Sequence, residues 1–155
     1  MSKNDVCYTF EAAIESAIEM ENAGFRHYLA AMRKVSDKGA QEILRENALD
    51  ELNHKYRLEM ALLDGKLTGG EMLTEPIQAM HIDYAFSKDD LVSDAGMRGA
   101  MIYAIHMEKG AVDFYSRAAK ACASAPMAGV FTQLIEEESR HLKKLEAYYE
   151  KHFMS

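Results

Sequence analysis

Apolar residues recur every three to four positions along four long stretches of the chain, the period of one buried face of an α-helix. The four predicted helices cover residues 9–35, 40–64, 94–121 and 126–152. Thr9 is a suitable N-cap for the first helix, Gly65 ends the second, and Pro126 suits the first turn of the fourth. The pattern therefore predicts an all-α fold with four long amphipathic helices.

The expected core-facing residues follow from the same period. In the first helix they are Ala13, Ala17, Met20, Gly24, Tyr28 and Ala31. In the second helix they are Ile43, Leu44, Ala48, Leu52, Leu58 and Leu62.

The links between the helices predict how they are connected. Short links join the first helix to the second and the third to the fourth. Residues 65–92 form a long connection containing Gly69, Gly70 and Pro76, with room for a short helix near Pro76. We therefore expect a single domain, residues 1–155, built as a four-helix bundle with one long crossover between helices two and three.

The chain also repeats itself at an offset of 87 residues. The first and third helices share a Glu-x6-Tyr pattern, and the second and fourth share a Glu-x-x-His pattern. The matching pairs are Glu21 and Glu108, Tyr28 and Tyr115, Glu51 and Glu138, and His54 and His141. Two helix pairs with one pattern indicate a duplicated helical hairpin.

The repeated residues have the chemistry of a metal site. Residues at i and i+3 lie on one helix face, so Glu51 and His54 can reach one metal, and Glu138 and His141 likewise. A carboxylate can bridge two cations while an imidazole binds each, and two further glutamates would supply one terminal ligand per metal. Four carboxylates would balance two divalent ions. The residues proposed as metal ligands are Glu21, Glu51, His54, Glu108, Glu138 and His141.

Tyr28 and Tyr115 lie two turns after Glu21 and Glu108, on the same helix faces. From there each hydroxyl could donate a hydrogen bond to a ligand carboxylate across the bundle. The alternative is an ordinary half-buried core tyrosine. The histidines outside the repeat, His27, His81, His106 and His152, are expected to have no metal role.

Composition and charge exclude several classes of function. A formal charge of −7 without a cluster of Lys and Arg argues against nucleic-acid binding. No stretch approaches the ~18 apolar residues of a membrane span, and the polar first ten residues do not predict a secretory signal. The cytoplasm is therefore the expected location. Cys7 and Cys122 cannot form a Cys-x-x-Cys site.

At these residues the chain resembles the rubrerythrin-type branch of the ferritin-like superfamily. The resemblance covers residues 9–64 and 94–152, and its most specific elements are the two Glu-x-x-His motifs. It implies a non-haem di-iron centre that reacts with hydrogen peroxide or dioxygen in a homodimer or larger assembly, with electrons from an external donor such as a rubredoxin.

The chain departs from the rubrerythrin pattern at two points. No C-terminal rubredoxin domain like that of rubrerythrins is expected, and Ala111 stands where rubrerythrins have a further iron-binding glutamate. The six-ligand site is therefore expected, and the usual peroxidase activity is put in question. Leu52 stands where bacterioferritin has its haem-binding methionine, so no haem is expected.

Three functions are compatible with this reading. The leading one is a di-iron oxidoreductase that reduces peroxide or dioxygen. The alternatives are a ferroxidase or iron-storage subunit, and a bundle that binds metal or a partner without turnover. Manganese, or a mixed manganese–iron pair, also suits the ligands.

Overall fold

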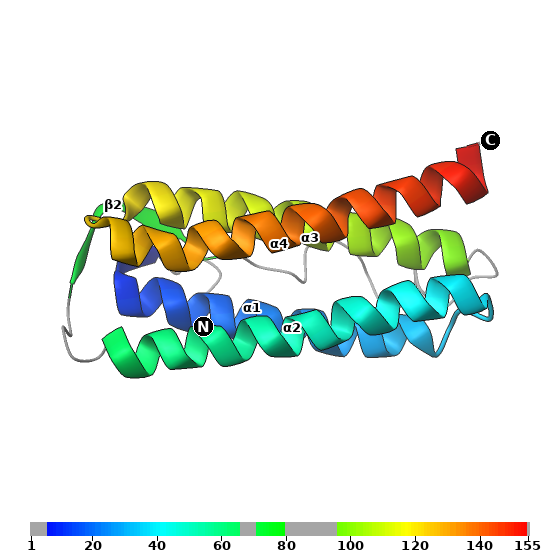
Figure 1. Ribbon diagram of the computed structural model, residues 1–155, viewed down its shortest axis with the longest axis horizontal. Coiled ribbons are helices and arrows are strands. Elements are labelled where there is room, and N and C mark those ends of the chain that lie inside the picture. The colour runs from blue at the N-terminus through cyan, green and yellow to red at the C-terminus, as the bar shows by residue number, and fades with distance from the viewer. Residues whose placement is uncertain (1–5, 66–70, 80–95, 155) are drawn as a thin grey trace.

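The computed structural model describes residues 6–65, 71–79 and 96–154, and within them the fold is an all-α four-helix bundle (Figure 1). The helices are α1 (Phe10–Met32), α2 (Lys38–Gly65), α3 (Gly96–Ala121) and α4 (Ala125–Tyr149), and α4 continues into a short π-helix, η3 (Glu150–Met154). All four predicted helices are confirmed within a few residues at the ends the structure describes. The start proposed for the third, residues 94 and 95, lies outside the described residues.

Side chains cap the starts of three helices, and one of these caps, Thr9, is as predicted. The Thr9 hydroxyl accepts a hydrogen bond from the Ala12 backbone N–H at 3.1 Å, and Ser124 accepts one from Met127 at 3.4 Å. Asp37 does the same for α2, since its carboxylate accepts the Ala40 N–H at 2.8 Å. Each contact satisfies a backbone donor that the first helical turn leaves without a partner.

The bundle consists of two antiparallel helix pairs. In Figure 1, α1 packs along α2 in the lower half and α3 along α4 in the upper half. The two pairs meet through contacts of α1 with α3 and of α2 with α4. The predicted crossover between α2 and α3 stays a prediction, because residues 66–70 and 80–95 lie outside the described residues.

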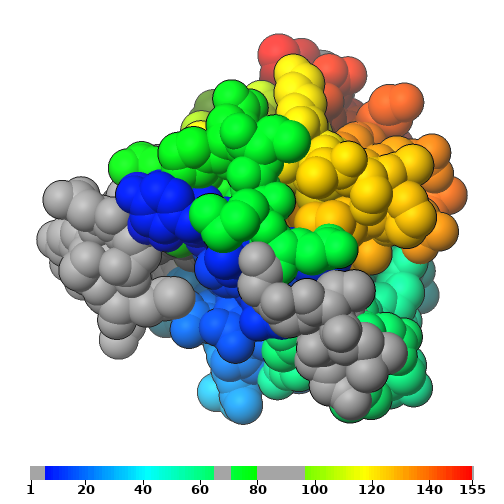
Figure 2. Space-filling model, turned by 90° about the vertical axis from the view of Figure 1, so that its left-hand side faces the viewer, coloured from blue at the N-terminus to red at the C-terminus, as the bar shows by residue number. Residues whose placement is uncertain are grey.

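Two short strands cover one end of the bundle. Strand β1 (Val6–Thr9) pairs antiparallel with β2 (Met72–Gln78), and the two lie side by side over that end (Figure 2). The helix envisaged near Pro76 is therefore wrong. A residue before proline avoids the helical region, so Glu75–Pro76 favours extended chain, which proline tolerates in an edge strand. The Thr74 hydroxyl ties β2 to the Ala121 carbonyl at 3.1 Å.

One apolar core runs through the bundle, and it agrees with the predicted faces except on α2. All six residues expected on the inner face of α1 are buried. On α2, Leu44, Ala48 and Leu58 are buried, but Leu52 is 42% exposed, so its assignment to the core is wrong. No helix among the described residues is long and apolar enough to cross a membrane.

Candidate metal centre

All four helices contribute to one buried cluster of carboxylates and imidazoles midway along the bundle. The six predicted ligands are between 0% and 7% exposed. They form two overlapping groups whose ligand atoms lie within 4.8 Å of one another. One group is Glu21, Glu51, His54 and Glu138, and the other is Glu51, Glu108, Glu138 and His141. The structure thus brings together every residue that the repeat singled out.

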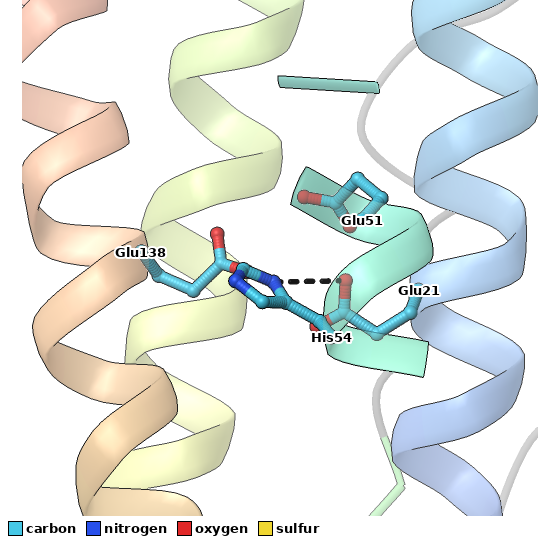
Figure 3. Close-up of side chains that lie close together, drawn as sticks. All are labelled: Glu21, Glu51, His54 and Glu138. Atoms are coloured by element: carbon cyan, nitrogen blue, oxygen red, sulfur yellow. Dashed lines mark ion pairs between the residues drawn. The ribbon is translucent and has the colours of Figure 1, made fainter. Parts of the chain in front are cut away.

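The two groups share Glu51 and Glu138 and differ in their imidazole and their third carboxylate. In the first group His54 Nδ1 lies 2.7 Å from Glu138 Oε1 and 3.5 Å from Glu21 Oε2 (Figure 3). In the second group His141 Nδ1 lies 3.6 Å from Glu138 Oε2 and 3.9 Å from Glu108 Oε1. The two oxygens of Glu138 therefore face different imidazoles, as a carboxylate shared between two cations requires.

The outer nitrogen of each imidazole contacts a second carboxylate, which sequence reasoning missed. His54 Nε2 lies 2.7 Å from Glu137 Oε2, and His141 Nε2 lies 2.6 Å from Asp50 Oδ2. Arg57 in turn pairs with Glu137. A carboxylate that accepts the Nε2 proton leaves Nδ1 as the nitrogen with a lone pair for a metal. The sequence does contain a sign of these contacts, because an acidic residue directly precedes each Glu-x-x-His motif, and the two acidic residues are again 87 positions apart.

The two tyrosines cross between the helix pairs as their spacing predicts. Tyr28 on α1 donates a hydrogen bond to Glu108 on α3, and Tyr115 on α3 donates one to Glu21 on α1. Both hydroxyls are buried, and burial raises the pKa of both tyrosines well above the ordinary value, so they stay protonated donors. Tyr28 and Tyr115 therefore each hold the Oε1 atom of a glutamate, and in Glu21 the other oxygen, Oε2, faces His54 Nδ1.

Asn47 breaks the twofold repeat of the site. Its buried side-chain amide donates to the Tyr28 hydroxyl at 3.4 Å. The equivalent position beside Tyr115 is Leu134, which cannot donate a hydrogen bond, and Phe131 stacks on the Tyr115 ring at 6.0 Å. The two tyrosines consequently lie in unequal surroundings, one polar and one apolar. Sequence reasoning missed Asn47 because it has no partner in the repeat.

Gly24 gives Glu51 the room to reach the cluster. A Cβ atom at position 24 would lie 2.8 Å from Glu51 Oε2, which is closer than van der Waals contact allows. The repeat equivalent of Gly24 is Ala111, which is also buried. Both line a void of ≈ 10 Å³ beside Glu51 and Glu138. A void of this size holds about one water-sized molecule.

Burial and mutual charge perturb the ionisable groups of the cluster. Burial, together with the Glu21 and Glu138 carboxylates, raises the pKa of Glu51 well above its ordinary value. Burial alone would lower the pKa of His54, but the neighbouring Glu138 and Glu21 raise it to about 10. Burial alone would raise the pKa of Glu138, but the imidazoles of His141 and His54 hold it below its ordinary value. Without a cation, the cluster thus retains protons at neutral pH.

Several polar atoms of the cluster have no hydrogen-bond partner although they are buried. They include Oε2 of Glu21, Oε2 of Glu108, Oε2 of Glu138 and Nδ1 of His141. Unsatisfied buried polar atoms are costly and rare, and here they converge on two points. Four carboxylates and two imidazoles are ligands that suit divalent first-row metals, so the buried Glu and His groups could hold metal ions.

A polar cleft leads from the surface towards the cluster between α2 and α4. It has a volume of ≈ 410 Å³, and its lining includes Asp50, Glu137 and His141. The carboxylates that contact the outer imidazole nitrogens therefore also line the route from solvent. Arg57, Arg140 and Lys144 line the same cleft, so both positive and negative side chains border this route.

Two histidines outside the repeat contact aromatic rings. His27 lies beside Tyr103 with ring centroids 5.0 Å apart, and His152 stacks on Tyr148 at 4.0 Å. Neither belongs to a group of potential metal ligands found among residues 6–65, 71–79 and 96–154. His81 lies outside the described residues.

Fold and site together define the class of molecule: an all-α four-helix bundle with a buried Glu and His cluster that could bind metal. Comparison of the chain with known protein families, with curated proteins and with solved structures finds no match. The assignment of function therefore depends on the chemistry of the cluster itself.

Proposed function

We propose that this protein is a non-haem di-iron oxidoreductase of the rubrerythrin type, within the ferritin-like superfamily, that reduces hydrogen peroxide or dioxygen. The observation that carries the proposal is the sharing of Glu51 and Glu138 between two otherwise separate ligand groups. A single-metal structural site needs no such sharing. Two adjacent cations do, because a bridging carboxylate holds them at a fixed separation.

The roles of the residues follow from their positions. Glu51 and Glu138 would bridge the two irons, His54 and Glu21 would bind one of them, and His141 and Glu108 would bind the other. Four carboxylates would balance the charge of two ferrous ions and so remove the repulsion among buried negative charges. Leu52 offers no thioether, so the proposal includes no haem.

When bound, two ferrous ions would supply the two electrons that, with two protons, convert hydrogen peroxide to two molecules of water. The protein positions the ligands and controls access to them. Tyr28 and Tyr115 orient the terminal carboxylates through their hydrogen bonds, while Asp50 and Glu137 fix the imidazoles. The void beside Gly24 and Ala111 has room for about one water-sized molecule next to the proposed bridging carboxylates. An external donor, such as a rubredoxin, would return the electrons.

Stopped-flow absorption tests the proposal. The protein is loaded anaerobically with two equivalents of Fe²⁺ and mixed with hydrogen peroxide. We expect rapid formation of diferric absorption in the near ultraviolet, with one peroxide consumed per two irons. Iron that binds but stays ferrous would leave a metal-binding bundle without turnover and contradict the proposal.

A matched pair of variants links the reaction to the cluster. Glu51→Gln removes the charge of a shared carboxylate and should abolish binding of the second iron. Glu42→Gln changes an exposed glutamate on the same helix and should react like the wild type. Equal oxidation rates for the two variants would place the reacting iron elsewhere.

A further inference from the structure

The ligands of the metal centre repeat along the chain, but the residues around them do not. We define the His54 position as the point enclosed by Glu21, Glu51, His54 and Glu138, and the His141 position as the point enclosed by Glu51, Glu108, Glu138 and His141. If the surroundings repeated as well, the two positions would bind a cation equally well. Each difference between them therefore bears on which position binds the first ion.

The terminal carboxylate of the His141 position is fixed by a chain of two hydrogen bonds. The buried Asn47 amide donates to the Tyr28 hydroxyl at 3.4 Å, and that hydroxyl donates to Glu108. A hydroxyl that accepts one hydrogen bond is polarised and donates its own more strongly. Glu108 is therefore oriented before a cation arrives, which lowers the cost of binding one.

The terminal carboxylate of the His54 position lacks the second of these hydrogen bonds. Tyr115 donates to Glu21, as the repeat requires. The residue equivalent to Asn47 is Leu134, which has no donor, and the Phe131 ring stacks on Tyr115 with centroids 6.0 Å apart. Glu21 is thus held by a hydroxyl that no equivalent amide supports.

The inner nitrogens of the two imidazoles also differ. His54 Nδ1 already lies 2.7 Å from Glu138 Oε1 (Figure 3), so a cation at the His54 position must break that contact. His141 Nδ1 lies 3.6 Å from Glu138 Oε2 and 3.9 Å from Glu108 Oε1, both beyond the range of a good hydrogen bond. His141 also lines the polar cleft, with 8% of its side chain exposed against 1% for His54. Both features favour the His141 position.

The carboxylates that contact the outer nitrogens are unequal as well. Glu137, which contacts His54 Nε2, is shared with the Arg57 guanidinium. Asp50, which contacts His141 Nε2, forms no ion pair with a Lys or Arg of the described residues. A carboxylate that is not shared with a cation makes the imidazole more basic, and a more basic imidazole is a better metal ligand. The outer contacts therefore favour the same position.

We propose that the His141 position binds the first metal ion, more tightly than the His54 position binds the second, and that Asn47 is a positioning residue that contributes to this difference. The proposal rests on the pair of metal ions in the proposed function, but not on the reaction with peroxide. Co²⁺, which suits the same oxygen and imidazole ligands, can therefore test it. Binding in two steps is not sufficient evidence, because a bound cation repels a second one even at identical positions. The test must locate the first ion.

Anomalous diffraction at the cobalt absorption edge locates that ion. Crystals grown with one equivalent of Co²⁺ per chain should show a peak at the His141 position that is several times stronger than any peak at the His54 position. Equal peaks, or a stronger peak at the His54 position, overturn the proposal and leave the proposed function standing. Absence of cobalt from both positions refutes the metal pair itself, and the proposal with it.

Replacement of Asn47 tests its role. Asn47→Leu copies the equivalent residue Leu134 and should weaken the first step of a calorimetric Co²⁺ titration by about 10-fold, while the second step changes by less than about threefold. The two anomalous peaks should also become more nearly equal, which a general loss of stability would not produce. The control Leu134→Met changes the equivalent residue without adding a hydrogen-bond donor and should titrate like the wild type.

Tyr28→Phe tests the same chain of hydrogen bonds if thermal unfolding shows that Asn47→Leu does not fold. It removes the hydroxyl between Asn47 and Glu108 and should weaken the first step at least as much as Asn47→Leu. Wild-type affinity for the first ion in a folded variant, with the stronger peak still at the His141 position, overturns the role assigned to Asn47.

Discussion

Adding a methyl group at Gly24 should weaken metal binding without destabilising the fold. The new Cβ would lie 2.8 Å from Glu51 Oε2, whereas ordinary contacts begin near 3.4 Å, so the carboxylate must move by about 0.6 Å. A ligand constellation tolerates displacements of only about 0.5 Å. Because Glu51 belongs to both ligand groups, the displacement disturbs both metal positions at once.

The metal-free protein should be as stable as the wild type or slightly more stable, although its metal affinity falls. Gly24 lies inside α1, where alanine is favoured over glycine by roughly 0.5–1 kcal/mol, and the only group that must move is the end of a flexible side chain. We therefore expect Gly24→Ala to melt at the same temperature as the wild type or slightly higher. Its affinity for the second metal ion should fall by about 10- to 100-fold.

Gly129→Ala is the matched control, because a Cβ there meets no atom within 4 Å. It should gain the same helical stability in α4 without any change in metal affinity. Anaerobic calorimetric titration with Fe²⁺ and thermal unfolding of the metal-free proteins give the two readouts. Wild-type iron affinity in Gly24→Ala would refute the claim that Glu51 is a ligand that needs this space.

Three further predictions concern the groups around the ligands. Tyr28→Phe and Tyr115→Phe should each slow iron oxidation in stopped-flow traces while two irons still bind, because each variant loses one hydrogen bond to a terminal carboxylate. Wild-type oxidation rates in both variants would exclude an orienting role for the tyrosines. Asp50→Asn should lower iron affinity by about 10- to 100-fold in a competition titration, whereas an unchanged value would show that the His141 contact is incidental. Iron affinity should rise with pH between 6 and 8, because the metal-free His54, with its pKa raised to about 10, carries a proton that the metal displaces. Each displaced proton increases the affinity about tenfold per pH unit. An iron affinity that does not change with pH would refute this prediction.

The helices and the site were predictable because both depend on local spacing. Apolar periodicity located the helices, and the i, i+3 relation placed each glutamate beside its histidine before any tertiary contact was known. The 87-residue repeat then supplied the long-range information that a single sequence usually lacks. It brought Glu21 and Glu108 to the same centre as the two Glu-x-x-His motifs, which the structure shows.

The features that were missed depend on contacts distant in sequence. Strand β2 forms because it pairs with β1, which lies some 65 residues earlier in the chain. The residues of Met72–Gln78 alone do not indicate which segment they pair with. Asp50 and Glu137 resemble solvated surface residues, with side chains 41% and 28% exposed, and only the fold brings them to the imidazoles. Leu52 was assigned to the core because α2 carries apolar residues on two faces, and helical periodicity alone does not say which face is buried.

Anomalous diffraction at the iron absorption edge is the strongest test of whether these six residues hold a pair of metal ions. Crystals of anaerobically iron-loaded protein should show two anomalous peaks in each chain. One should lie among Glu21, Glu51, His54 and Glu138, and the other among Glu51, Glu108, Glu138 and His141. A single peak, or peaks away from these residues, would contradict the account.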